Sequence, residues 1–240
     1  MNITIDFHSH VLPEVDDGSG SLEESLALLR LEAEQGVAQV VATPHFYPGY
    51  DSPERFLRRR NEAEARLREA MADQNDLPEV IMGAEVYYFP GISESYSLSE
   101  LTFYEKRCIL IEMPESPWTE SMYRELANIW EKWGITPIIA HVDRYIRPFR
   151  TYGIPERLAE LPVVVQANGS FFRNGYTRNL AMRLLRENKI QLLGSDCHNM
   201  DTRKPNLGET SAWIRKRLGQ SAIDRINNCG RELLLRDGIV

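Results

Sequence analysis

The chain of 240 residues is poor in cysteine, carries no excess of positive charge and contains no long apolar run. Its three cysteines, Cys108, Cys197 and Cys229, are odd in number and lack zinc-finger spacing. We therefore expect no disulfide framework and a reducing, cytoplasmic location. No apolar run approaches the roughly 20 residues of a membrane span, and we find no signal-peptide pattern, so no membrane insertion is expected. The formal net charge of -7 argues against non-specific binding to nucleic acid.

Short apolar segments rich in β-branched residues recur seven times, and most of them are separated by amphipathic helical patterns. Because these segments are apolar throughout rather than alternating, they indicate a parallel sheet that is buried on both faces. No linker or charge block divides the chain, so we predict one α/β domain over residues 1–240 with barrel-like βα repetition. The predicted strands span residues 3–7, 37–43, 80–86, 108–112, 135–141, 163–168 and 190–195.

Four of the five histidines follow predicted strands, and His141 is the last residue of one. Alternate residues of a strand point to the same side, so His8 and His10 share a face. An isolated histidine is usually an ordinary buried side chain, but that explanation is poor for all five. In βα barrels functional residues lie at the carboxyl ends of the strands. We therefore expect one mouth to receive His8, His10, His45, Glu85, Glu112, His141, Asp196 and His198, with Gln166 and Asn168 beside them.

This set of side chains has the composition of a metal centre. Together with Asp17 it exceeds the four ligands of one tetrahedral zinc and would supply two or three metals. Mixed nitrogen and oxygen ligands without thiolate suit manganese, iron or zinc. Closely spaced metals can generate hydroxide and clamp the oxygens of a displacement at phosphorus. Arg144 and Arg203 lie just after His141 and His198 and could hold phosphate oxygens, although each could instead form a surface ion pair.

At these residues the sequence resembles the polymerase-and-histidinol-phosphatase (PHP) metal-dependent phosphoesterases. Within them it is most similar to the bacterial tyrosine-protein phosphatases of capsule and exopolysaccharide operons. The resemblance runs from residue 6 to about residue 208. The matching stretches are Asp6-Phe-His-Ser-His-Val-Leu-Pro-Glu-Val-Asp-Asp-Gly18, Ala42-Thr-Pro-His45, Gly83-Ala-Glu85, Ile111-Glu112, Pro137-Ile-Ile-Ala-His141 with Arg144-Tyr145, and Gly194-Ser-Asp-Cys-His-Asn199.

The resemblance implies a distorted seven-stranded (β/α) barrel that holds three metals, typically manganese. One metal would take His8, His10, Glu85 and Asp196; a second would share Glu85 and take Glu112 and His141; a third would take Asp17, His45 and His198. Arg144 and Arg203 match positions that bind the phosphate. The preference for Asp17 over Asp16 rests on this resemblance alone.

Two positions depart from the pattern of these phosphatases. Val142-Asp143 stands where Pro-Glu is expected, which puts an acid role of that carboxylate in doubt. Cys197 stands where a small residue such as alanine is usual.

The function implied is hydrolysis of phosphotyrosine by a metal-activated hydroxide. The substrate would be a phosphotyrosine protein, by the resemblance a capsule-type bacterial tyrosine kinase, and the process capsule or exopolysaccharide synthesis. Tyr47, Tyr50 and Tyr88 could flank a phenyl ring, although packing among loop aromatics would explain each equally well. A small phosphoester such as histidinol phosphate would suit the same centre. Nuclease activity is not expected, because the chain lacks a basic stretch that could bind a nucleic-acid backbone. The arginine-rich segment Arg58-Arg59-Arg60 is typical of a solvated helix face.

A second phosphatase chemistry overlaps this site, because Cys197 and Arg203 have the C-x5-R spacing of cysteine-dependent tyrosine phosphatases. That chemistry needs a thiolate beneath a loop of backbone amides. The intervening residues contain no glycine, and alternation along an extended segment would point Cys197 away from Asp196 and His198. We therefore favour the metal centre; the oligomeric state stays open.

Overall fold

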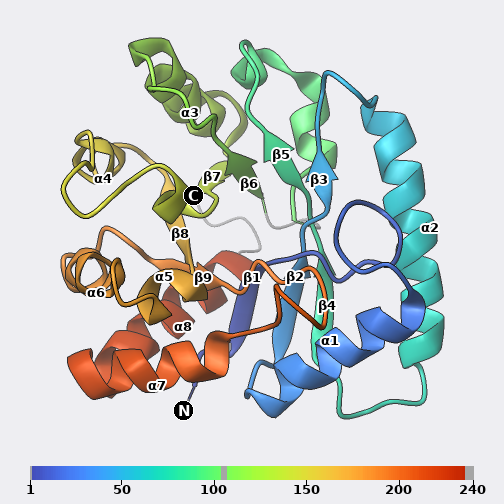
Figure 1. The fold of residues 1–240 in the computed structure, drawn as a ribbon. Coiled ribbons are helices and arrows are strands. Elements are labelled where there is room, and N and C mark those ends of the chain that lie inside the picture. The colour runs from blue at the N-terminus through green and yellow to red at the C-terminus, as the bar shows by residue number, and fades with distance from the viewer. Residues whose placement is uncertain (1, 104–106, 236–240) are drawn as a thin grey trace.

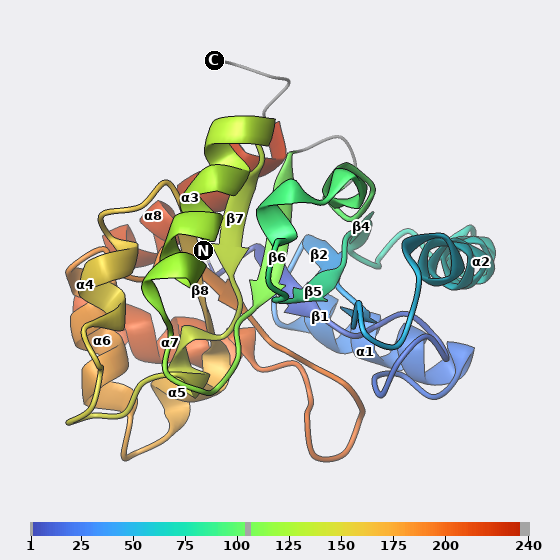
Figure 2. The ribbon, with the colours of Figure 1, turned by 90° about the horizontal axis from the view of Figure 1, so that it is seen from above.

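The computed structural model describes residues 2–103 and 107–235. Parallel strands occupy the centre, and the longer helices lie around them (Figures 1 and 2). The strands are β1 (Ile5–Ser9), β2 (Gln39–Ala42), β3 (His45–Phe46), β4 (Glu79–Met82), β5 (Glu85–Tyr87), β6 (Cys108–Glu112), β7 (Thr136–Ile139), β8 (Val164–Asn168) and β9 (Leu192–Gly194). The α-helices are α1 (Leu22–Glu34), α2 (Pro53–Met71), α3 (Glu120–Trp133), α4 (Ile154–Leu158), α5 (Gly169–Arg173), α6 (Arg178–Arg186), α7 (Leu207–Leu218) and α8 (Gln220–Leu235). Short 3-10 helices span Ile92–Glu94, Tyr96–Glu100 and Val142–Arg144.

The strands form two curled parallel sheets rather than the single seven-stranded barrel implied by the resemblance, which is not confirmed. One sheet has the order β1-β2-β4, and the other has the order β3-β5-β6-β7-β8-β9. The difference arises because two predicted strands each break in two. Pro44, which lacks a backbone donor, separates β2 from β3. Gly83 and Ala84 separate β4 from β5, and a Cβ at Gly83 would come within 2.6 Å of the Phe103 ring.

Backbone hydrogen bonds bring the first strand against the segment that follows the last one. The amide of Asp196 donates to the carbonyl of His8 over 2.8 Å, and the amide of His10 donates to the carbonyl of Cys197 over 2.9 Å. The two segments that carry the His-x-His and Asp-x-His patterns are therefore tied together by the main chain.

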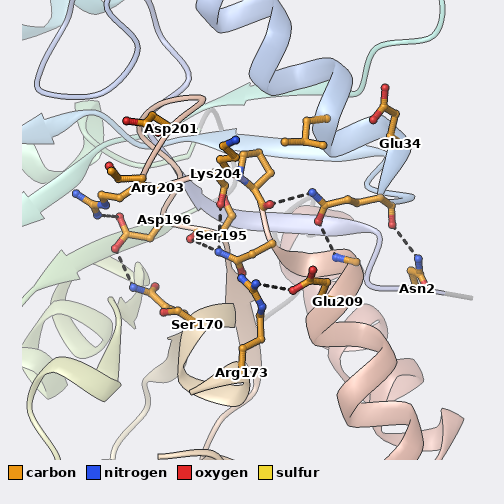
Figure 3. Close-up of a pocket in the computed structure, with 17 residues that line it drawn as sticks. Asn2, Glu34, Ser170, Arg173, Ser195, Asp196, Asp201, Arg203, Lys204 and Glu209 are labelled. Atoms are coloured by element: carbon orange, nitrogen blue, oxygen red, sulfur yellow. Dashed lines mark hydrogen bonds and ion pairs between the residues drawn. The ribbon is translucent and has the colours of Figure 1, made fainter. Parts of the chain in front are cut away.

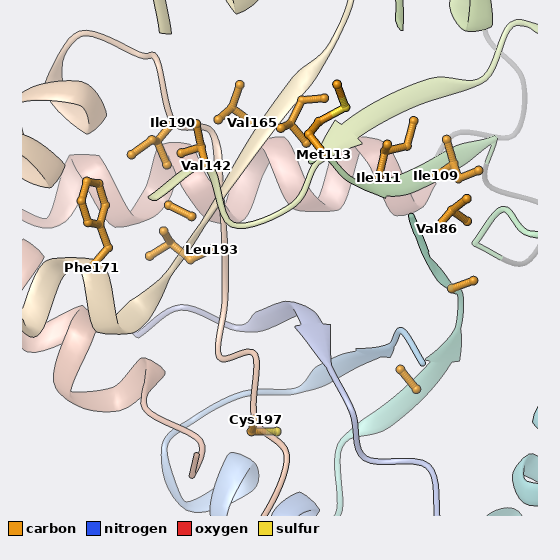
Figure 4. Packing of buried hydrophobic residues seen from close by; sticks show 14 of the residues in the cluster. Val86, Ile109, Ile111, Met113, Val142, Val165, Phe171, Ile190, Leu193 and Cys197 are labelled. Atoms are coloured by element: carbon orange, nitrogen blue, oxygen red, sulfur yellow. The ribbon is translucent and has the colours of Figure 1, made fainter. Parts of the chain in front are cut away.

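Both faces of the larger sheet are buried, as the sequence predicts. Along β6, Ile109 and Ile111 belong to the core that packs against the helices (Figure 4). Cys108 and Leu110 belong to a second core with Phe7. Alternate residues of one strand thus pack into two different cores, as the two-residue period requires.

The residues at the starts of α1 and α2 are of the types that favour the beginning of a helix. The Ser21 side chain accepts a hydrogen bond from the Glu24 amide at the start of α1, and Pro53 occupies the first turn of α2. None of the helices in the described part of the chain combines the length and the apolar character that a membrane crossing requires. Arg60 departs from the expected solvated face of α2, because it is buried and donates to the Gly83 carbonyl over 3.1 Å.

Candidate metal centre

The structure brings all nine predicted metal ligands together at the carboxyl ends of the strands. Six of them are buried: His8, His10, Glu85, His141, Asp196 and His198. His45 and Glu112 are nearly so, and Asp17 alone is well exposed, with 68% of its side chain accessible. Two of the predicted ligands, His141 and Asp196, have a strained backbone, because their φ angles are positive, at 29° and 52°. Packing around the centre must offset that strain.

Glu85 lies at the middle of the centre, surrounded by four imidazoles. Its Oε2 lies 3.1 Å from His8 Nε2, 3.3 Å from His10 Nε2 and 3.0 Å from His45 Nδ1. Its Oε1 lies 2.7 Å from His141 Nε2. Burial alone would raise the pKa of Glu85, but the charge and hydrogen bonds of these histidines hold it well below its usual value. The carboxylate is therefore ionised and ready to share cations with the rings.

Asp196 forms the opposite wall. Its Oδ1 lies 3.6 Å from both His8 Nε2 and His10 Nε2. It accepts hydrogen bonds from Arg203 over 2.6 Å and from Arg144 over 2.9 Å. Arg144 also donates to Glu112 over 3.0 Å. The two arginines are about one third exposed, so their remaining N–H groups face the mouth of the centre.

Asp16 and Asp17, which the sequence could not separate, have different environments. Asp16 Oδ2 lies 2.7 Å from His10 Nδ1 and accepts the His45 amide over 2.9 Å. Asp16 therefore orients the His10 ring through Nδ1, on the side of the ring away from Nε2. Asp17 Oδ1 lies 3.6 Å from Nε2 of both His45 and His198, which is longer than a hydrogen bond.

Gln166 and Tyr145 support the centre from behind. Gln166 Oε1 accepts the His141 amide over 2.5 Å and lies 3.4 Å from His8 Nδ1. The Tyr145 hydroxyl accepts the Met113 amide over 2.9 Å and lies 3.3 Å from His141 Nδ1. The sequence had suggested Gln166 as a neighbour but not the supporting role of Tyr145; its place four residues after His141 was the available signal.

The donor set fits divalent metals. The atoms within 4.8 Å of one another group as His10 with Asp17, His45 and His198; His8 with Glu85 and His141; His8 with His10 and Asp196; and His45 with Glu85 and Glu112. His198 Nε2 is buried without a hydrogen-bond partner. His45 Nδ1 lacks one too, because its 3.0 Å approach to Glu85 is not in hydrogen-bonding geometry. Buried nitrogens without partners are costly unless a cation occupies the space between them.

The grouping differs from the partition that the resemblance implied. Glu85 and Glu112 lie with His45, and His141 lies with His8 and Glu85. His10 lies with Asp17, His45 and His198 as well as with His8 and Asp196. It therefore stands between two of the predicted metal positions.

Two cavities open beside the centre. The larger, of about 740 Å³, is bordered by Asp196 and Arg203 and extends to the Arg173–Glu209 ion pair (Figure 3). The smaller, of about 520 Å³, is lined by Asp17, His45, Tyr47 and Tyr50. Tyr47 stacks on His45 with ring centroids 5.1 Å apart, and Tyr50 is 87% exposed. Tyr88 is not brought to either cavity, since it is buried and its hydroxyl donates to Glu125 over 2.7 Å.

Asp143 and Cys197, at which the chain departs from the phosphatase pattern, belong to none of these groups of predicted ligands. Asp143 Oδ1 accepts the Asn168 amide over 2.9 Å, and burial raises the pKa of the Asp143 carboxyl to about 6. Cys197 is fully buried in the core (Figure 4). Its Sγ groups with the buried carboxylates of Asp6 and Glu32.

Burial, with these acids nearby, raises the pKa of the Cys197 thiol well above its usual value. The structure does not support the cysteine-dependent alternative, because the Cys197 side chain is fully buried and is not accessible as a nucleophile.

Comparisons with known proteins agree with this geometry. The tyrosine-protein phosphatase CpsB of Streptococcus pneumoniae is 32% identical over 225 residues, covering 90% of this chain and 91% of the relative. The tyrosine-protein phosphatase YwqE of Bacillus subtilis is 28% identical and covers 97% of this chain and 92% of the relative.

Solved structures show the same fold. A crystal structure from the metal-dependent tyrosine phosphatases YwqE of Bacillus subtilis and CpsB of Streptococcus pneumoniae matches with a TM-score of 0.83 at 24% identity, covering 99% of this chain and 96% of that one. Histidinol phosphate phosphatase of Lactococcus lactis, solved with zinc, L-histidinol and phosphate, matches with a TM-score of 0.57 at 13% identity, covering 92% and 94%. The model of the CpsB/CapC family of capsular polysaccharide synthesis matches residues 4–235, and the chain belongs to that family.

Proposed function

We propose that the chain is a metal-dependent protein-tyrosine phosphatase. The observation that carries the proposal is the convergence of five histidines and four carboxylates on one mouth, with Arg144 and Arg203 at its rim. Membership of a family whose curated relatives are named tyrosine-protein phosphatases supports the same reaction. Side chains of this kind, with no ionised thiol among them, suit hydrolysis at phosphorus without a phosphoenzyme.

The metals would be held by His8, His10, Asp17, His45, Glu85, Glu112, His141, Asp196 and His198. Three positions follow from the resemblance, and manganese is our choice, with iron or zinc compatible with the same donors. Bound there, divalent metals would polarise the phosphoryl oxygens and lower the pKa of water.

The residues of the chain would bind and orient the substrate. Arg144 and Arg203 present guanidinium groups whose planar N–H donors match the phosphate oxygens, and they would stabilise charge as it builds on those oxygens. Asp16 and Gln166 fix the rings of His10 and His8 through their Nδ1 atoms. Tyr47, stacked on His45, offers a surface for the tyrosyl ring. The leaving phenolate has a parent pKa near 10, so strong acid assistance is unnecessary.

The physiological setting extends the proposal. We infer a cytoplasmic enzyme whose substrate is a phosphotyrosine protein, namely a capsule-type bacterial tyrosine kinase, and whose activity regulates capsule or exopolysaccharide synthesis. Support comes from the family and from the odd number and the spacing of the three cysteines, which predict no disulfide framework.

The test is phosphate release from a phosphotyrosyl peptide, measured before chelation, after chelation, and after return of Mn²⁺, Fe²⁺ or Zn²⁺. We expect activity to vanish on chelation and to return with metal, most strongly with Mn²⁺. Histidinol phosphate is measured in parallel. Hydrolysis of histidinol phosphate without hydrolysis of the peptide would replace the proposal by the small-molecule alternative, and activity that persists after proven removal of metal would overturn the metal-dependent chemistry.

A further inference from the structure

Three kinds of side chain line the smaller cavity beside the centre. Asp16, Asp17 and His45 belong to or support the candidate metal centre, and Tyr47 and Tyr50 supply aromatic rings. The remaining charged lining residues, Asp51, Arg55 and Arg59, have no part in that centre. A cavity that combines metal ligands, aromatic rings and guanidinium groups suits a phosphorylated aromatic group with a further anion beside it.

The guanidinium groups of Arg55 and Arg59 are preorganised. Arg55 and Arg59 lie four residues apart on α2 and so project from the same face of the helix. Arg55 Nε and Arg59 Nη1 each lie 2.5 Å from the Asp51 carboxylate, and Arg55 Nη2 donates to the Tyr50 carbonyl over 2.8 Å. These contacts fix both guanidinium groups at the edge of the cavity before any ligand arrives, which reduces the entropy lost on binding.

The acids of the cavity divide between its two groups of basic residues. Asp16 and Asp17 face the histidines of the centre. Asp51 alone faces the two guanidinium groups, and only 10% of its side chain is exposed. Arg55 and Arg59 have 56% and 41% of theirs exposed. Each guanidinium carries five N–H donors, and Asp51 and Tyr50 use only some of them. An incoming carboxylate therefore meets positioned donors without having to displace Asp51.

We infer that Arg55 and Arg59 form a subsite for an acidic side chain of the peptide that flanks the phosphotyrosine. This inference rests on the proposed phosphatase function and adds to it a substrate class, acidic phosphotyrosyl peptides. The formal net charge of the chain is -7, so its long-range field disfavours acidic peptides. A preference for them would have to come from a local feature of this kind.

The experiment compares phosphotyrosyl peptides of equal length that carry glutamate, glutamine or lysine on both sides of the phosphotyrosine. The measured quantity is the ratio of kcat/KM for the glutamate peptide to kcat/KM for the lysine peptide, with the metal-loaded protein. For the native chain we expect a ratio of about five or more, the upper end for one exposed ion pair. The glutamine peptide should fall between the two.

Two variants locate the effect. In the double variant Arg55→Glu with Arg59→Glu, the ratio should fall below one. Arg58→Glu is the control, because it makes the charge change of one of these two substitutions at an exposed position of the same helix outside the cavity, and its ratio should equal that of the native chain. A ratio between two substrates on one preparation does not depend on how much of a variant has folded.

The outcomes distinguish failure of the acidic subsite from failure of the phosphatase function. A native ratio near one, a ratio unchanged in the double variant, or an equal fall in Arg58→Glu would overturn the acidic subsite and leave the phosphatase function standing. Absence of hydrolysis of all three peptides by the metal-loaded chain would overturn the proposed function and the subsite with it.

Discussion

Replacing Asp16 by asparagine should separate the orienting carboxylate from its neighbour Asp17. Asp16 lies 2.7 Å from His10 Nδ1 and accepts the amides of His45 and Gly18, each over 2.9 Å. Asparagine keeps an oxygen acceptor in the same place and removes only the charge. Because partners of this kind set the orientation and basicity of a liganding imidazole, we expect metal affinity to fall about 10- to 100-fold.

A second consequence concerns the protein after chelation of metal. Burial lowers the pKa of His10, but the Asp16 carboxylate more than offsets this, and the pKa rises from 6.5 to about 10. A raised pKa means that protonated His10 stabilises the fold below pH 6.5 and that this contribution disappears as the pH rises from 6.5 through about 10. A hydrogen bond between charged groups contributes about 2 kcal/mol. For a chain of this size that amounts to roughly 4–8 °C in Tm.

The assay is thermal unfolding of the chelated protein at pH 6 and pH 10, together with calorimetric titration of Mn²⁺. Between the two pH values, the Tm of the native chain should fall by roughly 4–8 °C more than that of Asp16→Asn. Asp17→Asn is the control: Asp17 is 68% exposed and faces His45 and His198, so its loss should weaken metal binding but leave the pH dependence native. Equal pH dependence in the native chain and in Asp16→Asn, with equal metal affinity, would refute the orienting role.

Three further predictions concern single positions. His141→Ala should cut turnover of a phosphotyrosyl peptide by orders of magnitude with near-native circular dichroism, since its Nε2 lies 2.7 Å from Glu85; near-normal turnover would remove His141 from the site. Cys197→Ala should keep turnover within a few-fold, because the thiol is fully buried; loss of a chelator-resistant activity in this variant would restore the cysteine mechanism. Gly169→Ala should destabilise the fold by about 1–3 kcal/mol, measured by urea denaturation, because its Cβ would lie 2.0 Å from Asn206 Oδ1. Gly175→Ala, whose Cβ meets nothing within 4 Å, is the matched control, and equal stability of the two variants would contradict the packing argument.

The local features of this protein were readable from its sequence. The two-residue and 3.6-residue periods predicted buried parallel strands and amphipathic helices, and Ser21 and Pro53 marked helix starts that the structure confirms. Such signals depend on neighbours a few residues away, so they survive without knowledge of the fold. The position of each histidine after a strand likewise predicted the mouth at which the structure gathers them.

Only the tertiary structure decided which partners each of those side chains contacts. Asp16 and Asp17 are adjacent in sequence, yet Asp16 meets His10 and the amide of His45, 29 residues away, whereas Asp17 faces the opposite nitrogens. Tyr88 turned to Glu125, 37 residues away, instead of to the cavity. These choices depend on contacts between segments that are distant in the chain, and no local period encodes them.

Contacts between distant segments also decided how the strands pair and where the Cys197 side chain lies. Pro44 and Gly83 were visible in the sequence, but that they divide two strands between two sheets depends on the partners β3 and β5 find across the fold. The C-x5-R spacing of Cys197 and Arg203 was equally visible. Packing of the Cys197 side chain into the core decided that Cys197 and Arg203 do not face one phosphate. Residue types and their order determined which chemistry was available, and the packing of distant segments determined which atoms face one another to perform it.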